Sequence, residues 1–389
     1  MLIPKIQEAL SSAGLDGWLF FDHHHRDPLA YRVLSLPLDL HATRRWYYLI
    51  PATGSPQKLV HRIESGALDA LPGESHVYSS WREQQDELRA MLSTARQVAM
   101  QYSPNCSIPY VSMVDAGTVE LVRAFGANVV SSADLLQNFE ARWTEAQYRS
   151  HVAAGKVVDQ IRREAFDLLR QRLADSTPIT EFEIQQFILT RFSEREVVTD
   201  HGPIVAVNAN ASDPHYEPSR ERSSSVVRGD VVLIDLWAKS IQPGAVYYDV
   251  TWTGYCGHAI PDRVQNVFEI VRSARKRASS FVSGRAKRSE RIHGFEVDDV
   301  ARTYIDEQGY AEHFFHRTGH SIGTDVHGTG ANMDNWESHD DRLIVANTCF
   351  SIEPGIYLAD FGIRSEVNVY VGDGFAHVTG EEQEQLILI

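Results

Sequence analysis

Short apolar segments alternate with amphipathic segments along the first ~140 residues. Apolar runs of strand length occupy four stretches, at residues 16–22, 44–51, 96–103 and 126–132. Between them, apolar residues recur at helical spacing in residues 3–14, 81–95 and 114–126. The last of these segments ends at Gly126, and glycine is a common helix stop. Strands that are separated by helices predict a small α/β domain.

The pattern changes near residue 143. Thr144 stands three residues before Gln147, which is the spacing of a capping box at the start of a helix. Apolar residues then keep helical spacing through residues 144–173. We therefore expect two domains, comprising residues 1–140 and residues 141–389.

Strand-like segments dominate the chain beyond residue 197. They lie at residues 203–209, 230–238, 245–253, 348–358 and 362–371, and two helical segments, 264–282 and 296–309, lie between them. This order predicts an α+β second domain with a mainly antiparallel sheet.

Composition and charge narrow the class of protein. The chain has 389 residues, more than one hydrophobic core usually serves, and a net charge of −15 that argues against binding to nucleic acid or to an anionic membrane. Residues 272–291 are a basic exception, for which we expect a solvated helix face followed by a loop. Without a secretory signal or a long apolar segment, and with three unclustered cysteines, the chain is expected to be cytoplasmic with reduced thiols.

Acidic residues interrupt the strand-like segments at positions that look buried. Asp235 lies within an apolar run, Asp249 has aromatic and β-branched neighbours, and Glu353 and Glu366 adjoin apolar residues. Acidic side chains are rarely buried without a partner, and Arg364 is the only basic residue within these segments. Two divalent cations would neutralise the four carboxylates and leave room for one neutral imidazole. Structural hydrogen bonding by any one of them remains the alternative.

Strand periodicity predicts which of these side chains share a face. Arg364 and Glu366 are two residues apart, and so are Asp249 and Thr251. On a strand, residues two apart point to the same face. We therefore expect the Thr251 hydroxyl to orient the Asp249 carboxylate.

The segment HRTGHSIG at residues 316–323 permits two interpretations. GHSIG matches the nucleophile elbow of serine hydrolases, with Ser321 as nucleophile. That elbow requires an apolar strand before the serine and a helix after it, whereas the following residues are rich in Gly and Asn. His320 as a metal ligand is the favoured interpretation. A second histidine cluster, residues 23–25, is interpreted as a polar loop rather than a metal site.

The ligand set and its surrounding motifs resemble a known family, the pita-bread metallopeptidases, which include methionine aminopeptidase, aminopeptidase P and prolidase, with the metal-free creatinase as a relative. The resemblance rests on DPHYEP (213–218), HRTGHSIGTDVHG, SIEPGIY and GIRSEV in this order. It also rests on five candidate metal ligands in the family's order, Asp235, Asp249, His320, Glu353 and Glu366. It covers the chain strongly from about Thr144 to its end.

The resemblance implies a fold. Residues 141–389 would form a pita-bread catalytic domain with a curved, mainly antiparallel sheet. Residues 1–140 resemble the α/β N-terminal domain of creatinase, prolidase and aminopeptidase P, which methionine aminopeptidase lacks. The same branch of the family implies a homodimer.

The resemblance also implies roles for the metal-binding residues. Asp249 would chelate one metal ion, and Asp235 and Glu366 would bridge the two. His320 would complete the shell of the first ion. Glu353 would bind that ion or its neighbour and act as general base and then general acid.

Further residues correspond to substrate-contacting positions of the family. His327 would stabilise the tetrahedral intermediate, and His215 would contact the substrate near the scissile bond. His316 and Arg364 would bind the proline side, including its carboxylate, although Arg364 as a mere counter-ion remains an alternative. His327 is followed by Gly328 where relatives carry an acidic residue.

The predicted activity is hydrolysis of Xaa-Pro bonds by a dinuclear metallopeptidase. Oxygen ligands with one imidazole favour Mn²⁺, with Co²⁺ and Zn²⁺ as alternatives. An Xaa-Pro dipeptidase is expected because the N-terminal region is short, and an aminopeptidase P that acts on longer peptides is the alternative. A creatinase-like metal-free hydrolase and a non-enzymatic pita-bread binding module are the remaining rivals.

Overall fold

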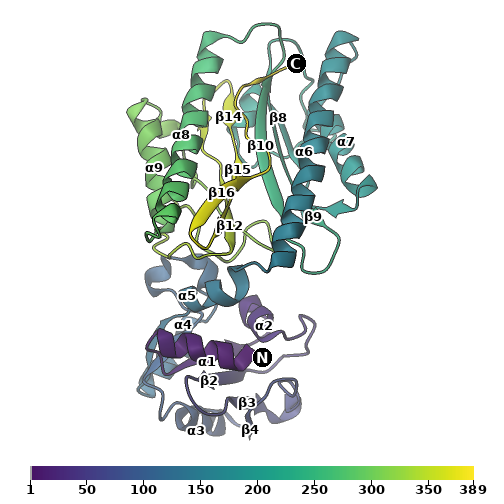
Figure 1. Cartoon of the computed structure of the whole chain (residues 1–389). Coiled ribbons are helices and arrows are strands. Elements are labelled where there is room, and N and C mark those ends of the chain that lie inside the picture. Colours follow the sequence, from purple (N-terminus) through teal and green to yellow (C-terminus); the bar gives the residue numbers. More distant parts are fainter. Residues whose placement is uncertain (1) are drawn as a thin grey trace. The chain divides into compact units, whose positions relative to one another are not determined.

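The computed structural model describes residues 2–389 and contains two compact units, Met1–Glu140 and Ala141–Ile389 (Figure 1). A six-stranded sheet with the order β4-β3-β2-β1-β5-β6 forms the centre of the first unit. Its strands are β1 (Gly17–Asp22), β2 (Trp46–Pro51), β3 (Gln57–His61), β4 (Glu74–Tyr78), β5 (Gln97–Met100) and β6 (Asn128–Ser131). Its main helices are α1 (Leu2–Ser12), α2 (Pro28–Leu34), α3 (Trp81–Met91), α4 (Ala116–Ala124) and α5 (Ala133–Leu136).

Both faces of this sheet are buried, which explains the uninterrupted apolar run of β1. Trp18 and Phe20 belong to a core on one face, and Leu19 and Phe21 belong to a separate core on the other. Alternating side chains of one strand thus enter two different layers of packing. The predicted α/β class of this part of the chain is confirmed, whereas β3, β4, α2 and α5 were not predicted.

Two sheets and a short hairpin make up the second unit. The first sheet has the order β17-β10-β9-β7, with β8 also paired to β9, and the second has the order β11-β12-β15-β16. All neighbours are antiparallel except β10 and β17, so the predicted mainly antiparallel arrangement is confirmed. The strands are β7 (Val197–Val198), β8 (Ile204–Val207), β9 (Val231–Ser240), β10 (Tyr248–Tyr255), β11 (Ser321–Ile322), β12 (Thr348–Ile352), β13 (Gly355–Tyr357), β14 (Gly362–Arg364), β15 (Val367–Gly372), β16 (Phe375–Thr379) and β17 (Ile387–Leu388).

Helices cover these strands from two sides (Figure 1). One core joins α6 and α7 to the sheet that contains β9 and β10, and a second core joins α8 and α9 to β12, β14 and β15. The helices are α6 (Glu145–Ala174), α7 (Glu181–Glu194), α8 (Asp262–Lys287) and α9 (Gly294–Glu307). The predicted capping box is present, since the Thr144 hydroxyl accepts the Gln147 N–H while the Gln147 side chain accepts the Thr144 N–H. Within residues 2–389, no helix has the length and apolar character that crossing a membrane requires.

Two predicted strands are each divided in the structure. Residues 348–358 form β12 and β13, which are separated by Glu353 and Pro354. Residues 362–371 form β14 and β15, separated by Ser365 and Glu366. Pro354 has no N–H with which to continue a ladder. The premise that Arg364 and Glu366 lie on one strand was therefore wrong.

The basic segment 272–291 lies in the second half of α8 and the turn that follows it. The expected solvated helix face describes only part of this segment, because Arg275 is fully buried. Its guanidinium lies 3.8 Å from Glu384, whose carboxylate also accepts hydrogen bonds from Arg272 and Lys276. Much of the positive charge is thus paired within the chain.

Candidate metal centre

The register of β9 and β10 fixes one side of the site. Thr251 is paired with Asp235, and Asp249 is paired with Trp237. Directly paired residues on antiparallel strands point to the same face, as do residues two apart on one strand. All four side chains therefore project from one face, and Asp235 and Asp249 are both buried there.

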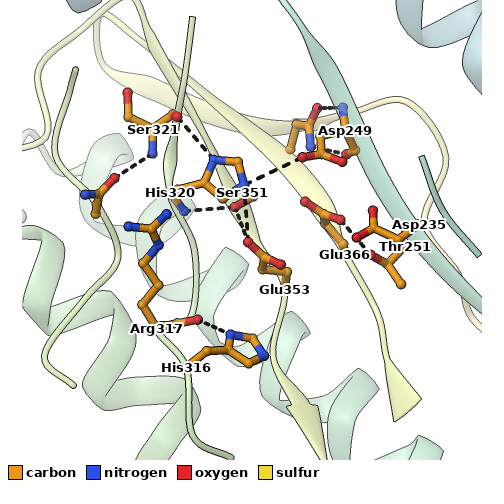
Figure 2. Close-up of polar contacts among 12 residues, drawn as sticks. Asp235, Asp249, Thr251, His316, Arg317, His320, Ser321, Ser351, Glu353 and Glu366 are labelled. Carbon is orange, nitrogen blue, oxygen red and sulfur yellow. Dashed lines mark hydrogen bonds and ion pairs between the residues drawn. The ribbon is translucent and has the colours of Figure 1, made fainter. Parts of the chain in front are cut away.

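The pairing of β11 with β12 brings the histidine to this face. His320 precedes β11, and Glu353 follows β12. The Ser351 hydroxyl accepts the His320 backbone N–H at 2.9 Å and donates to Glu353 Oε1 at 3.0 Å. The imidazole Nε2 consequently lies 3.3 Å from Glu353 Oε1 and 3.6 Å from Asp249 Oδ2. Figure 2 shows His320, Asp249, Glu353 and Glu366 converging on one region.

A divalent cation fits the donor set at this point. Asp249, His320 and Glu366 each offer one ligand atom, and these atoms lie within 4.8 Å of one another. Among the described residues, Asp235 Oδ1, Asp249 Oδ1 and Glu366 Oε1 are buried and have no hydrogen-bond partner. Three such carboxylate oxygens beside an imidazole are typical of a site that binds a cation.

Electrostatics supports the same interpretation. Burial, together with repulsion from the neighbouring carboxylates, raises the pKa of Asp249 to about 7 and that of Glu366 well above its ordinary value. Burial also raises the pKa of Asp235, against the effect of Arg364. Without a cation, this cluster of carboxylates is therefore costly to ionise. Glu353, which is less buried, differs: burial raises its pKa, but the charged neighbours together, His320 and Arg364 foremost, lower it overall.

Arg364 is the counter-ion of Asp235 in the structure. Its guanidinium donates to Asp235 Oδ2, to the Thr251 hydroxyl at 3.1 Å and to the Tyr357 hydroxyl at 3.3 Å. These contacts agree with the alternative interpretation, in which Arg364 serves as a counter-ion. A role in binding the substrate carboxylate remains a prediction.

Tyr357 is a site residue that sequence reasoning missed. Its hydroxyl lies 2.7 Å from His316 Nε2 and also accepts from Arg364, so it joins the two predicted proline-side residues. His316 Nδ1 lies 2.7 Å from the Arg317 carbonyl, which can only accept, so Nδ1 carries the proton and Nε2 accepts from Tyr357. The only available signal was its place in SIEPGIY, four residues after Glu353.

Thr251 was expected to orient the Asp249 carboxylate, and this expectation was wrong. The Thr251 hydroxyl donates to Glu366 Oε2 at 2.8 Å, so it orients Glu366 instead of Asp249. Asp249 is fixed through its backbone by Asn368, whose side-chain oxygen accepts the Asp249 N–H at 3.0 Å and whose amide donates to the Asp249 carbonyl. Asn368 was also missed, because an asparagine in a strand carries no distinctive signal.

The remaining candidates lie at different distances from the cluster. His327 is adjacent, with its ring centroid 4.4 Å from that of His320. His215 lies exposed in a loop, and none of the described contacts joins its ring to the cluster. Ser321 lies on β11 with its hydroxyl accepting the Gly330 N–H, and the next element that the structure describes is strand β12, so the nucleophile-elbow interpretation fails.

The histidines at 23–25 lie in a turn of the first unit. Asp22 Oδ2 accepts the His25 N–H at 3.0 Å, and Asp22 Oδ1 accepts the N–H groups of Arg26 and Asp27. His24 and His25 have positive φ and are exposed. The segment is therefore a polar loop that Asp22 organises.

Comparison with known proteins gives the chain a family. Residues 149–373, more than half of the chain, match the model of metallopeptidase family M24. An Xaa-Pro dipeptidase of Lactobacillus delbrueckii subsp. lactis is 28% identical over 264 residues, which is 66% of this chain and 64% of the relative. A putative Xaa-Pro aminopeptidase of Mycoplasma pneumoniae is 29% identical over 228 residues, 57% of this chain and 58% of the relative. The matches thus span less than two thirds of either relative's length.

The fold has solved counterparts. Dipeptidase PepE from Mycobacterium ulcerans superposes with a TM-score of 0.72 at 23% identity, over 100% of this chain and 97% of that chain. At this identity the likeness concerns the fold alone. It confirms the predicted fold class, an α/β unit followed by an α+β pita-bread unit.

Proposed function

The chain belongs to metallopeptidase family M24, and on that premise we propose that it hydrolyses the Xaa-Pro bond of dipeptides with two divalent metal ions. The observation that carries the proposal is the set of buried, unpaired carboxylate oxygens on Asp235, Asp249 and Glu366 beside His320. The similarity to the Lactobacillus Xaa-Pro dipeptidase supports the substrate class.

Five residues would hold the metal ions, as the family resemblance implies. Asp249, His320 and Glu366 each offer one ligand atom within 4.8 Å of the others, and Asp235 and Glu353 would complete the site. Asp235 retains Oδ1 for this purpose, since Oδ2 accepts from Arg364. When bound, the ions would supply Lewis acidity that makes water more acidic at neutral pH. Mn²⁺ is the ion that we propose, because oxygen ligands predominate.

Glu353 is the residue that we assign to proton transfer. Its Oε1 is held by the Ser351 hydroxyl at 3.0 Å, and the side chain is more exposed than those of the other three carboxylates. A partly exposed carboxylate that its neighbours keep ionised can accept a proton and then donate it to the departing proline nitrogen. His327, beside the His320 ring, and the more remote His215 would donate hydrogen bonds to the reacting peptide group.

The proline side would lie toward His316 and Arg364. Tyr357 holds these two side chains together through one hydroxyl group. The fixed positive charge of Arg364 favours the carboxylate of a C-terminal proline at this end. Arg364 is buried and paired with Asp235 in the structure, so binding of the substrate carboxylate would be a second role beside that of counter-ion.

An Xaa-Pro aminopeptidase is the second candidate, favoured by the similarity to the Mycoplasma protein. The test is to strip the purified protein with a chelator, resupply Mn²⁺, and assay alanyl-proline beside alanyl-prolyl-alanine. We expect metal-dependent cleavage of the dipeptide alone. Comparable cleavage of the tripeptide would assign the second candidate. Turnover of creatine without metal, or binding of a partner without any hydrolysis, would contradict both.

Two broader features belong to the same proposal. The three free cysteines, two of them buried, support the expected cytoplasmic location. The homodimer is proposed on the family resemblance alone, and light scattering of the purified protein would check it.

A further inference from the structure

Trp237, on the strand face that carries Asp235 and Asp249, contacts a third acidic residue, Asp200. β7 pairs with Lys239 and Ser240 of β9, and β8 pairs with Asp235 of the same strand. Residues 199–203, which join β7 to β8, therefore run beside the part of β9 that contains Trp237. Within this connection, Asp200 Oδ1 accepts the Trp237 indole N–H at 2.7 Å.

The Trp237–Asp200 contact borders the metal centre. Trp237 is paired directly with Asp249. The Asp200 side chain is 43% exposed, so a ligand can reach its carboxylate. Its charge is felt within the site, because it contributes to the raised pKa of Tyr247, after burial, and counteracts the lowering of the pKa of His327.

The Asp200 carboxylate is held as an anion. It accepts the indole N–H and the His201 backbone N–H at 3.1 Å, and these bonds lower its pKa although burial alone would raise it. The ring of His201, at 3.2 Å, is itself 74% exposed. Lys239, the next residue on this face of β9, donates to the Thr324 carbonyl and lies over the Tyr247 ring, 4.7 Å from its centroid.

We propose that Asp200 binds the α-ammonium group of the substrate, and that Trp237 and Tyr247 line the space for the side chain that precedes proline. This inference rests on the proposed peptidase function. It names the feature of the substrate, a free amino terminus, that this end of the site selects.

The order of charges along the strands supports a dipeptide in one direction. Arg364 contacts Asp235 and Thr251, which form one cross-strand pair, while Asp200 contacts Trp237 in the next pair on the same face. Two such pairs are about 7 Å apart along the strands. Two extended residues span about the same distance. The positive charge is thus attached to one pair and the negative charge to the next, which is the order of the carboxylate and the ammonium along an extended dipeptide.

The experiment separates recognition of the ammonium from a merely structural role of the loop. We would measure kcat/KM for alanyl-proline, and the inhibition constant of propanoyl-proline, which lacks only the amino group. For Asp200→Asn we expect kcat/KM to fall roughly 10- to 100-fold, the range of a lost charge-assisted hydrogen bond. The inhibition constant should stay within about 2-fold. Trp237→Phe, which keeps an aromatic side chain but removes the indole N–H, should show a smaller loss of the same kind.

Two controls make the result decisive. Asp325→Asn removes another exposed negative charge that acts on Tyr247, and it should leave both constants within about 2-fold. Bound metal and the thermal midpoint should match the wild type for every variant. Equal losses with both compounds, or no loss, would overturn the inference while wild-type turnover leaves the peptidase function standing. A wild-type protein that cleaves no Xaa-Pro peptide would overturn both.

Discussion

The buried side chain of His151 links three elements of the second unit without carrying a charge. The His151 side chain, on α6, is fully buried. Its Nδ1 lies 2.6 Å from the Tyr247 carbonyl, and its Nε2 lies 2.6 Å from the Thr379 hydroxyl. A carbonyl only accepts, so Nδ1 donates, and the neutral ring then accepts at Nε2 from Thr379. The ring thus connects α6 to the start of β10 and the end of β16 without carrying a charge.

His151 predicts a pH dependence of stability. Burial lowers its pKa to about 4, below the ordinary value of 6.5. Between these values the unfolded chain binds a proton that the folded chain does not, so the free energy of unfolding falls as the pH drops from 6.5 to 4. We expect a loss on the order of 1–3 kcal/mol from this group.

Urea unfolding of the wild type and of His151→Asn at pH 7.5, 5.5 and 4.5 measures this contribution. The variant keeps a donor for the Tyr247 carbonyl but does not titrate in this range. The two curves of stability against pH should therefore converge toward low pH. Parallel curves would show that His151 does not titrate on unfolding.

The residues of the site differed in how far sequence could reveal them. Asp235 and Asp249 were predictable because a carboxylate within an apolar strand is anomalous and demands a cation. Tyr357, Asn368 and Trp237 are ordinary residues in strands, and only the folded chain shows that their polar atoms reach the site. An acidic residue within an apolar segment can be recognised from the sequence, whereas the partner of a side-chain contact cannot.

An ion pair on helix α9 holds the segment around His316 in place. Asp298, fully buried on α9, receives two hydrogen bonds of 2.9 Å from Arg302 one turn later. Arg302 also donates to the Phe314 carbonyl at 2.9 Å and to the His316 carbonyl at 2.7 Å. Asp298 in turn accepts the Thr318 N–H and hydroxyl. One helix turn thus fixes the backbone on both sides of His316.

Breaking this pair should affect both stability and substrate binding. Asp298→Asn leaves the largely buried Arg302 without its counter-ion, and the expected cost is about 3 kcal/mol in the free energy of unfolding. KM for alanyl-proline should rise more than kcat falls, because His316 loses its fixed position while the metal ligands remain. Chemical denaturation and steady-state kinetics measure the two effects.

The matched control is Arg263→Gln, which breaks the exposed pair between α8 and Asp360. Exposed pairs contribute at most about 1 kcal/mol, so this variant should resemble the wild type in both measurements. An Asp298→Asn protein with unchanged KM would show that the ion pair serves stability alone.

Elements were predictable where local chemistry determines them. The helix that begins at Glu145 follows from its capping box, whose hydrogen bonds form within four residues. The division of 348–358 into β12 and β13 was not, because the apolar pattern continues across Glu353 and Pro354. Which sheet each half joins depends on pairing with β14 and β15, which are formed by residues further along the chain.

At the scale of the whole molecule, the candidate metal ligands all belong to the second unit, between residues 235 and 366. A ligand that binds only the folded state stabilises the unit that holds it, by about 3 kcal/mol at a concentration 100 times its dissociation constant. Removal of metal should therefore lower the protection of residues 141–389 against hydrogen exchange and leave residues 1–140 unchanged.

Hydrogen exchange with mass spectrometry, on protein with Mn²⁺ and on chelator-treated protein, checks this expectation. Peptides that contain β9, β10, β12 and β15 should show the largest difference. Peptides from β1 and β2, in the first unit, serve as the internal control. A uniform change across both units would show that the units do not unfold independently.

The unpaired carboxylate oxygens of Asp235, Asp249 and Glu366 have a consequence for the history of such a protein. Burying them costs stability that well-packed apolar side chains of the same volume would not. Once selection for ion binding relaxes, neutral replacements at these positions are expected to spread, since they stabilise the fold. A protein with this fold that lost the three acids would lose the metal ions and its catalytic activity while its fold became more stable. It could then persist as a binding protein. Replacement of these three acids by uncharged residues would accordingly be the expected sign of a relative that has lost the ion.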